Sequence, residues 1–439
     1  MHLDSIKKRV IEFLKNNKMD YKDINMETCV DLFLEEMGKG LQGVESSLKM
    51  LPTYIDIENE IPLNEPVIVL DAGGTNFRVA SIYFGRDKKP VIEKYKKYTM
   101  PGLKREVSKE DFFKIIAGYT QDVVGVSANI GFCFSYPTEM LPNKDGRLIH
   151  LSKEIQAKEV IGELIGDNLV SAIRSMGYGE TKHVVLLNDT VATLLAGRSA
   201  FHDRVFDSYI GFILGTGTNC CYIEKNSNIP KDKNLNIGRD QIINIESGGF
   251  GKAPRGIIDL EFDKSMINPG MYTFEKMISG AYFGSLCLKT LLMAAEEGLI
   301  SHPLKEEFEK ISILDTEDVN DFLLYPDSKS NPLSSAISSG KEEDRITLCY
   351  IIDRLIERAA KLSAINLSSA VIESDKGKNP CYPVCITAEG STFYGLKTLK
   401  EKVEYYLKSY LVERQEHYYE FVNVENATLI GAAIAGLTN

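Results

Sequence analysis

The chain has 439 residues, a length that suggests two or three domains, and 44% of them are hydrophobic and 26% charged, a composition typical of a soluble globular protein. Its net charge of −11 disfavours general binding to nucleic acid or to anionic membranes, and no apolar run approaches the roughly 20 residues that span a bilayer. Since the first residues also lack the features of a secretory signal, we expect a cytoplasmic protein that binds neither nucleic acid nor membrane.

Apolar runs typical of strands alternate with stretches of helical periodicity along the chain. The expected strands are residues 67–70, 77–84, 129–135, 183–187, 209–214 and 220–223. The expected helices lie in residues 1–60, 160–173, 191–198, 346–367 and 431–437. Loops are expected at residues 325–340 and 375–383, where Ser, Pro, Asn and Gly are frequent. The alternation of strands and helices predicts an α/β architecture.

Two turns rich in Gly and Thr divide pairs of expected strands in the same way. The first turn is residues 71–76, and the second, residues 215–219, follows about 144 positions later. This repetition predicts two related lobes. The eight cysteines are scattered and form no C-x-x-C pair, so we expect reduced core thiols rather than a metal or redox site.

The two turns are also the first candidates for a phosphate site, although neither fits a Walker A loop or a Rossmann fingerprint. The adjacent glycines at 73–74 would let backbone N–H groups approach a phosphate closely. Thr75 would add a hydroxyl, Arg78 a positive charge, and Asp71 a carboxylate that orients Mg²⁺ through water. An ordinary glycine-rich hairpin is the alternative, and the presence of the second turn favours the functional interpretation.

Three further carboxylates are candidates for chemistry. Asp189 follows a strand and precedes a helix, where it could accept a proton from an attacking hydroxyl or could simply cap the helix. Glu246 lies among glycines and apolar residues, where a carboxylate can accept hydrogen bonds from sugar hydroxyls. Glu275 could do the same, but its local sequence favours a solvated charge on a helix.

Taken together, these segments resemble the hexokinase family. The phosphate motifs are matched by DAGGTNFR at residues 71–78 and GTGTNCCYIE at residues 215–224. The sugar and catalytic segments are matched by GFCFSYP at 131–137, LNDTVAT at 187–193, NIESGGFG at 244–251 and NPGMYTFEKMISG at 268–280. The segments occur in order, and the likeness runs from about residue 37 to the C-terminus.

The resemblance implies a two-lobed actin-like ATPase (ribonuclease H-like) fold, with small and large α/β domains around a central cleft. The small domain would comprise residues 62–189 plus 425–439, and the large domain residues 1–61 plus 190–424. The implied activity is transfer of the ATP γ-phosphoryl group to the 6-hydroxyl of a hexose, with glucose as the expected substrate. ATP and Mg²⁺ would be the cofactors, and the chain would be a monomer or a homodimer.

The resemblance also implies a role for individual residues. Asp189 would be the general base, and Asp189 and Asp71 would hold Mg²⁺, Asp71 through water. The implied sugar ligands are Ser135, Ser152, Lys153, Asn188, Asn219, Glu246 and Glu275. The implied nucleotide site comprises Asp71, Gly73, Gly74, Thr75, Asn76, Arg78, Gly215, Thr216, Gly217, Gly390 and Ser391. The reading of Glu275 as a solvated charge is reversed by this resemblance.

The chain departs from the family pattern mainly at the nucleotide end. It has no Trp, so Ser247 stands where the family has Trp after the sugar-binding Glu, and the family's Lys and His-Pro are missing near residues 394–396. Two alternatives therefore remain. A non-catalytic hexose sensor on the same fold would bind sugar without turnover. An actin- or chaperone-like ATPase would act on protein and would not need the sugar segment around Ser135.

Overall fold

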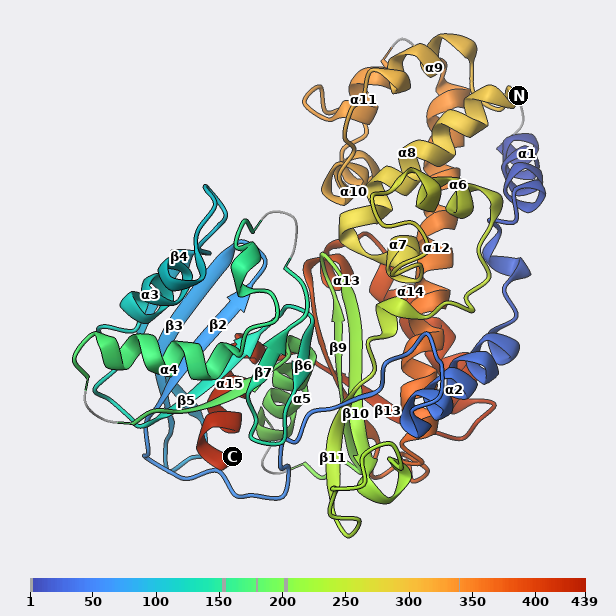
Figure 1. Cartoon of the computed structure of the whole chain (residues 1–439). Helices are drawn as coiled ribbons and strands as arrows, with labels where there is room; N and C mark the ends of the chain where they lie inside the picture. The colour runs from blue at the N-terminus through green and yellow to red at the C-terminus, as the bar shows by residue number, and fades with distance from the viewer. Residues whose placement is uncertain (1–2, 152–154, 179–180, 201–203, 339) are drawn as a thin grey trace.

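The computed structural model describes the chain except for residues 1–2, 152–154, 179–180, 201–203 and 339, and it has two lobes, each built on a mixed sheet (Figure 1). The small-lobe sheet has the strand order β4-β3-β2-β5-β8, and the large-lobe sheet has the order β1-β11-β10-β9-β12-β13. The small-lobe strands are Val67–Gly73 (β2), Asn76–Phe84 (β3), Pro90–Thr99 (β4), Asn129–Phe134 (β5) and His183–Leu187 (β8). The large-lobe strands are Leu51–Pro52 (β1), Ser208–Leu214 (β9), Thr218–Lys225 (β10), Asp240–Asn244 (β11), Val384–Glu389 (β12) and Tyr419–Val422 (β13). A separate hairpin joins Thr138–Met140 (β6) to Gly146–Leu148 (β7).

The two sheets repeat one topology. In the small lobe, β3 pairs antiparallel with β2 and β4, while β5 and β8 extend the sheet parallel to β2. In the large lobe, β10 pairs antiparallel with β9 and β11, while β12 and β13 extend the sheet parallel to β9. The predicted relation between the lobes is therefore confirmed, and the two glycine-rich turns occupy corresponding places after β2 and β9.

Helices cover both faces of each sheet, as expected for an α/β protein. In the small lobe, α3 and α4 cover one face and α15 the other; in the large lobe, α2 and α12 pack on one face and α5 on the other. The second half of α12 is buried nearly all round, as an interior helix requires. The first helices are Leu3–Asn16 (α1), Met26–Gln42 (α2), Lys109–Tyr119 (α3), Ile165–Ser175 (α4), Asp189–Ala200 (α5), Ile257–Ser265 (α6), Glu275–Ile278 (α7) and Gly280–Glu296 (α8). The later helices are His302–Glu309 (α9), Thr316–Leu324 (α10), Pro332–Ile337 (α11), Glu342–Glu373 (α12), Ser391–Gly395 (α13), Leu399–Leu407 (α14) and Ala427–Thr438 (α15).

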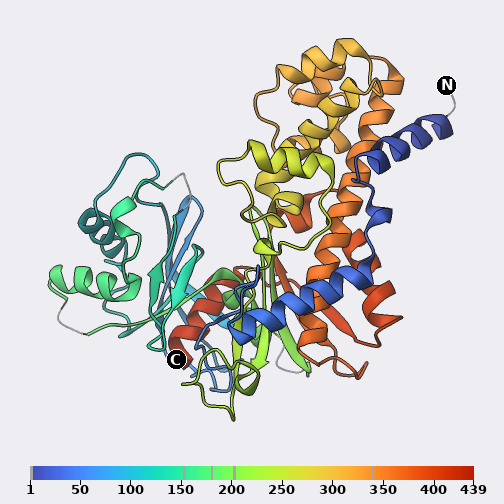
Figure 2. The same ribbon diagram turned by 45° about the vertical axis from the view of Figure 1, so that its right-hand side comes forward.

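Helices α5 and α15 join the lobes by packing against each other between the two sheets. The C-terminal helix α15 lies against the small-lobe strands although it follows the large-lobe strand β13 (Figure 2). Helix α5 follows the small-lobe strand β8 but packs on the large-lobe strands β9 and β12. Glycines permit this close approach: a Cβ atom at Gly431 would overlap the carbonyl oxygen of Ala192, and one at Gly131 would overlap that of Ala432.

Three expectations about secondary structure were wrong in detail. The helix expected from residue 160 begins at Ile165, because Gly162 adopts a φ of 87° that an α-helix cannot include. The expected loop 325–340 contains α11, which starts where the Asn331 side chain accepts backbone N–H groups and Pro332 occupies the first turn. The helical expectation for residues 1–60 fails at residues 51–52, which pair with β11 as a strand.

All eight cysteines are free thiols, and most of them are buried, whereas Cys381 is exposed. Burial raises the pKa of the Cys133 and Cys220 thiols well above the usual value, so both are poor nucleophiles. Within the ranges that the structure describes, no helix combines the length and the hydropathy needed to cross a membrane.

Replacing Gly431 by Ala should destabilise the protein, because the new methyl group would force α15 away from α5. Overpacking of this kind costs roughly 1–3 kcal/mol, which should appear as a lower Tm in a thermal melt. Gly38→Ala, in the middle of α2 where no atom lies within 4 Å of the new methyl group, is the matched control and should leave Tm equal or higher. An equal Tm for both variants would contradict the tight helix contact.

Candidate active site

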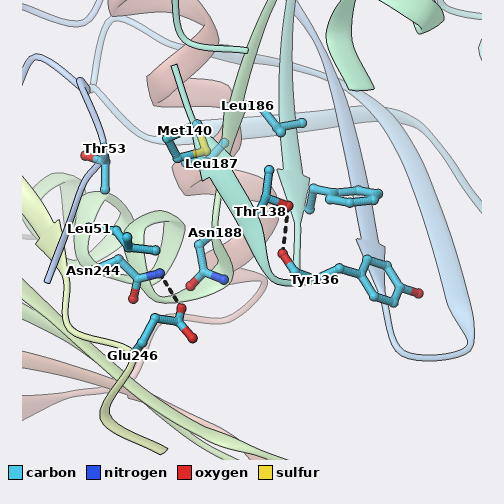
Figure 3. A pocket seen from close by; sticks show the side chains of 11 residues that line it. Leu51, Thr53, Tyr136, Thr138, Met140, Leu186, Leu187, Asn188, Asn244 and Glu246 are labelled. Atoms are coloured by element: carbon cyan, nitrogen blue, oxygen red, sulfur yellow. Dashed lines mark hydrogen bonds between the residues drawn. The ribbon is translucent and has the colours of Figure 1, made fainter. Parts of the chain in front are cut away.

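A pocket lies between the two lobes (Figure 3). The small lobe contributes Asn188 at the end of β8, and the large lobe contributes Glu246 just after β11. Their side chains point into the same space from opposite sides. The pocket is lined by Leu51, Thr53, Phe134, Tyr136, Thr138, Met140, Leu186, Leu187, Asn188, Asn244 and Glu246. The structure therefore brings together two residues that the sequence assigned to sugar binding.

The Glu246 carboxylate is oriented by amide side chains of the neighbouring strands. Its Oε1 atom accepts a hydrogen bond of 2.7 Å from the Nδ2 atom of Asn244 and one of 3.1 Å from the Nδ2 atom of Asn219. Asn219 in turn accepts the backbone N–H of Ser247 at 3.2 Å. Glu246 adopts a left-handed backbone conformation, with φ 59° and ψ 47°, which is uncommon for a non-glycine residue. These contacts fix the direction of the Glu246 carboxylate. Asn244, which makes the shorter of the two hydrogen bonds to it, was not among the predicted site residues.

Glu275 is the first residue of α7, and its carboxylate is enclosed rather than solvated. Its Oε2 atom accepts the backbone N–H of Thr218 at 2.9 Å. A Cβ atom at Gly217 would lie 2.6 Å from the same oxygen, and one at Gly248 would lie 3.2 Å from it. Burial raises the pKa of Glu275 to about 7, and the neighbouring Glu246 adds to the effect. The solvated interpretation from local sequence is wrong because the enclosing residues are distant in the chain.

Asp189 is the first residue of α5, at the carboxyl end of β8. The Thr190 backbone N–H is accepted by Asn188 Oδ1 at 3.0 Å and by Asp189 Oδ1 at 2.9 Å, and the Thr190 hydroxyl also bonds to Asn188 Oδ1 at 2.6 Å. Asn188 therefore takes the larger part in capping the helix. Burial raises the pKa of Asp189 to about 7, with a further contribution from Glu389. A carboxyl group with this pKa is suited to exchanging a proton near neutral pH.

The first glycine-rich turn joins β2 to β3. Asp71 on β2 is the register partner of Arg78 on β3, and the two side chains form an ion pair. The Asp71 side chain is only 3% exposed, whereas Arg78 reaches solvent with 27% of its side chain. Gly74 has a φ of 56°, and its carbonyl oxygen accepts the Tyr136 hydroxyl at 2.9 Å. Thr75, in the turn between β2 and β3, is exposed, and its hydroxyl oxygen accepts a hydrogen bond from the Asn76 side-chain amide at 3.3 Å.

The second turn, residues 215–217, joins β9 to β10 and lies against the Gly390–Ser391 segment. The Gly215 carbonyl oxygen accepts the Gly280 N–H at 2.8 Å and the Thr392 hydroxyl at 2.9 Å. Gly390 has a φ of 128°, and a Cβ atom there would overlap the Leu214 carbonyl oxygen. Thr216 is exposed. The structure thus unites all the large-lobe residues that the sequence assigned to the nucleotide.

Glu389, at the end of β12, is a carboxylate that sequence analysis missed. Its Oε2 atom accepts the Thr193 hydroxyl at 3.3 Å, and burial raises the pKa of Glu389, as does Asp71. The sequence did contain a signal for Glu389. It is an acidic residue at the carboxyl end of a strand, and it immediately precedes Gly390, which the resemblance assigned to the nucleotide site.

The described residues contain no group of three His, Cys, Asp or Glu side chains that could hold a metal ion. Mg²⁺ usually keeps several waters and takes one or two carboxylates, so Asp71 and Asp189 fit it as the oxygen ligands of a largely hydrated ion.

Among the remaining predicted sugar ligands, Ser135 lies beside the first turn. Its backbone N–H donates to the Ala72 carbonyl oxygen at 2.9 Å, and a Cβ atom at Gly73 would lie 3.5 Å from its hydroxyl. Ser152 and Lys153 lie outside the described residues.

Comparison with known proteins identifies the protein family of this chain. Two family models described as hexokinase match residues 12–199 and 209–438, so that together they cover nearly the whole chain. The chain belongs to the hexokinase family. The resemblance to this family and the two-lobed fold that it implied are thereby confirmed, and members of this family are ATP-dependent hexose kinases.

Relatives and solved structures agree with this assignment. Hexokinase-5 of Oryza sativa subsp. japonica is 31% identical over 80% of this chain and 73% of its own length. Hexokinase-1 of Schizosaccharomyces pombe is 28% identical over 93% of this chain and 86% of its own. The solved hexokinase from Schistosoma mansoni complexed with glucose has a TM-score of 0.82 at 24% identity, over the whole of both chains.

Ser247, which stands where the resemblance implies a Trp, is contacted by a side chain of the long helix α12. The Nδ2 atom of Asn366 donates to the Ser247 hydroxyl at 3.1 Å, and both side chains are fully buried. A polar contact thus stands where the resemblance implies an aromatic ring. The hydrogen bond from Asn366 holds the Ser247 side chain in place, and because Ser247 follows Glu246 directly, it also stabilises the turn that carries Glu246.

Glu275→Gln should make the protein more stable in alkaline solution. In the native state the Glu275 carboxyl has a pKa of about 7, against 4.5 in its ordinary state, so folding favours the protonated form. That contribution to stability is complete below pH 4.5 and is lost as the pH rises through 7, by an amount on the order of 3 kcal/mol. Thermal melts should show a variant Tm above wild type at pH 8 and close to it at pH 4.5. Glu45→Gln, an exposed site, removes the same charge and should show no such difference.

Proposed function

We propose that this chain is an active hexokinase, which transfers the γ-phosphoryl group of ATP to the 6-hydroxyl of a hexose, with glucose as its main substrate. The observation that carries the proposal is the place of Asp189, a carboxylate with a raised pKa between the pocket that contains Asn188 and Glu246 and the turn that contains Asp71. Its pKa is influenced by both Glu246 and Asp71, so it lies close to the sugar residues and the phosphate residues at once.

The sugar pocket supports hexose recognition because its polar groups have fixed directions. Carboxylates such as Glu246 and Glu275 accept hydrogen bonds from hydroxyls, while amides such as Asn188 and Asn219 can both donate and accept. A site built this way favours a polyhydroxylated ligand, since a ligand without hydroxyls would leave these groups unpaired. Glucose is proposed because a glucose complex of the Schistosoma mansoni relative has been solved on the same fold.

Phosphoryl transfer depends mainly on positioning and charge stabilisation. Arg78 and the backbone N–H groups of the two turns would hold the phosphates, and Mg²⁺, bound through Asp71 and Asp189, would neutralise the charge that the phosphates carry. Asp189 would take the proton from the attacking 6-hydroxyl. Water would be excluded by the lobes as they meet around the sugar.

ADP release with Mg-ATP and a panel of sugars tests the proposal directly. The panel is glucose, mannose, fructose, galactose, N-acetylglucosamine and no sugar. ADP release that depends on glucose supports the proposal, and the ranking gives the substrate. No turnover with any sugar, while calorimetry still shows glucose binding, would favour the sensor. The absence of both from folded protein would contradict hexose recognition.

Asp189→Ala should abolish most turnover without abolishing sugar binding. Loss of a general base typically lowers kcat by ~10²–10⁴-fold, and glucose affinity measured by calorimetry should change little. In the wild type, kcat/KM should fall about tenfold per pH unit below pH 7, as Asp189 becomes protonated. Asp240→Ala, an exposed carboxylate on the large-lobe sheet, is the control. Near-normal turnover in Asp189→Ala would exclude the assigned base.

Glucose should draw the two lobes together, because the pocket walls and the sugar ligands come from both. The moving parts would be the small domain of residues 62–189 with 425–439 and the large domain formed by the rest. Small-angle X-ray scattering should show a smaller radius of gyration when glucose is bound. An unchanged radius in a sample whose glucose binding has been measured would argue against closure.

A further inference from the structure

Thr428 is a buried hydroxyl that belongs to none of the motifs identified in the sequence, yet it lies inside the proposed phosphate site. It stands in the first turn of α15, 350 and 357 positions from its two partners, and only 5% of it is exposed. Its hydroxyl donates to the Oδ2 atom of Asp71 at 2.8 Å. The Oγ1 atom of Thr428 also accepts a hydrogen bond of 2.8 Å from the Nη2 atom of Arg78. Thr428 thus bonds to both members of the Asp71–Arg78 ion pair.

A hydroxyl group is suited to this place because it can donate one hydrogen bond and accept others at the same time. Arg78 presents five N–H donors in a rigid plane, so a fixed acceptor at one nitrogen sets the direction of the others. Asp71 is likewise held from two sides, by Arg78 and by Thr428. Since Arg78 retains exposed surface, the part of its guanidinium that these bonds do not occupy is available to a ligand.

The repeated topology explains why a residue at the far end of the chain reaches this site. Helices α5 and α15 occupy corresponding places, each following the last strand of its repeat. The first turn of α5 carries Asp189, and the first turn of α15 carries Thr428. Because α15 packs on the small-lobe strands β2 and β5, its first turn meets the end of β2, where Asp71 is located.

We propose that Thr428 is a positioning residue for phosphoryl transfer: it fixes Asp71 and Arg78 in the arrangement that receives the phosphates of Mg-ATP. The proposal rests on the proposed kinase function. Without the hydroxyl, the Asp71–Arg78 pair would keep its charges but would lose the contact that sets its direction. The buried Asp71 carboxylate would then also lack a donor, which in a site with little water weakens every bond of the network.

A purely structural role would have different consequences. If the hydroxyl only anchored α15 to the small lobe, its removal would lower Tm and would weaken sugar and nucleotide binding together. If it positions Asp71 and Arg78, the nucleotide end alone should suffer, since Asn188, Glu246 and Glu275 have no bond to Thr428. Affinity for Mg-ATP measured against affinity for glucose therefore separates the two roles.

The test compares Thr428→Val, which has nearly the same shape but no hydroxyl, with Thr428→Ser, which keeps the hydroxyl. Thr438→Val is the matched control, because that hydroxyl lies in the last turn of the same helix and donates to the Ile434 carbonyl oxygen at 2.8 Å. The measurements are steady-state kinetics for Mg-ATP and glucose, calorimetry with each ligand, and thermal melts.

Loss of a hydrogen bond to a charged group should lower kcat/KM for Mg-ATP in Thr428→Val by about 10- to 100-fold, with the glucose Kd within about twofold of wild type. Thr428→Ser should recover most of this loss, and Thr438→Val should show none of it. Unchanged Mg-ATP kinetics and affinity in Thr428→Val, or equal losses for glucose and Mg-ATP, would overturn the proposal. If the wild type turned over no sugar, the kinase function would fail, and Mg-ATP calorimetry on Thr428→Val would still decide the role of Thr428.

Discussion

The close contact between α5 and α15 is the constraint on which the rest of the structure depends. Each helix follows the strands of one lobe and packs on the sheet of the other, so an exchange of helices joins the lobes. Backbone meets backbone where Gly431 faces Ala192 and Gly131 faces Ala432. The contact also fixes the first turns of both helices, which carry Asp189 and Thr428. The fold and the proposed chemistry therefore depend on the same small residues.

The site accepts an electrostatic penalty that a protein built only for stability would avoid. Asp189, Glu246 and Glu275 all have pKa values raised by burial, and none of the three has an ion-pair partner among the described residues. Amide groups and backbone N–H groups orient Glu246 and Glu275 instead, at a lower energetic return than a counter-charge would give. The arrangement suits the proposed recognition of sugar hydroxyls, because a carboxylate already paired with a cation has less capacity to accept hydrogen bonds from a sugar.

Much of the fold and part of the site could be predicted from the sequence. The strand positions and the repeated glycine-rich turns follow from local patterns, and the family resemblance placed Asp71, Asp189 and Glu246 in order. Glu389 was missed although its position at the end of a strand, directly before Gly390, offered a signal. Asn244 and Thr428 were missed because partners that give them a role, Asn219 and Asp71, lie in other elements. Glu275 was misjudged locally for the same reason: its enclosure depends on Gly217 and Gly248. Contacts between distant elements decide burial, and a single sequence does not display them.

The balance of charge around the transfer point bears on the choice of phosphoryl donor. Glu389 and Asp71 both raise the pKa of Asp189, and Asp71 also raises the pKa of Glu389. Arg78 is the cation that lowers the pKa values of Asp71 and Glu389. A bare nucleotide triphosphate would bring further negative charge to this group and would meet repulsion from the carboxylates. A divalent cation that arrives with the nucleotide reverses the sign of the interaction, since the carboxylates then become oxygen ligands for the metal and its waters. The arrangement of carboxylates therefore supports the proposal that the magnesium complex of the nucleotide, rather than the free nucleotide, is the substrate.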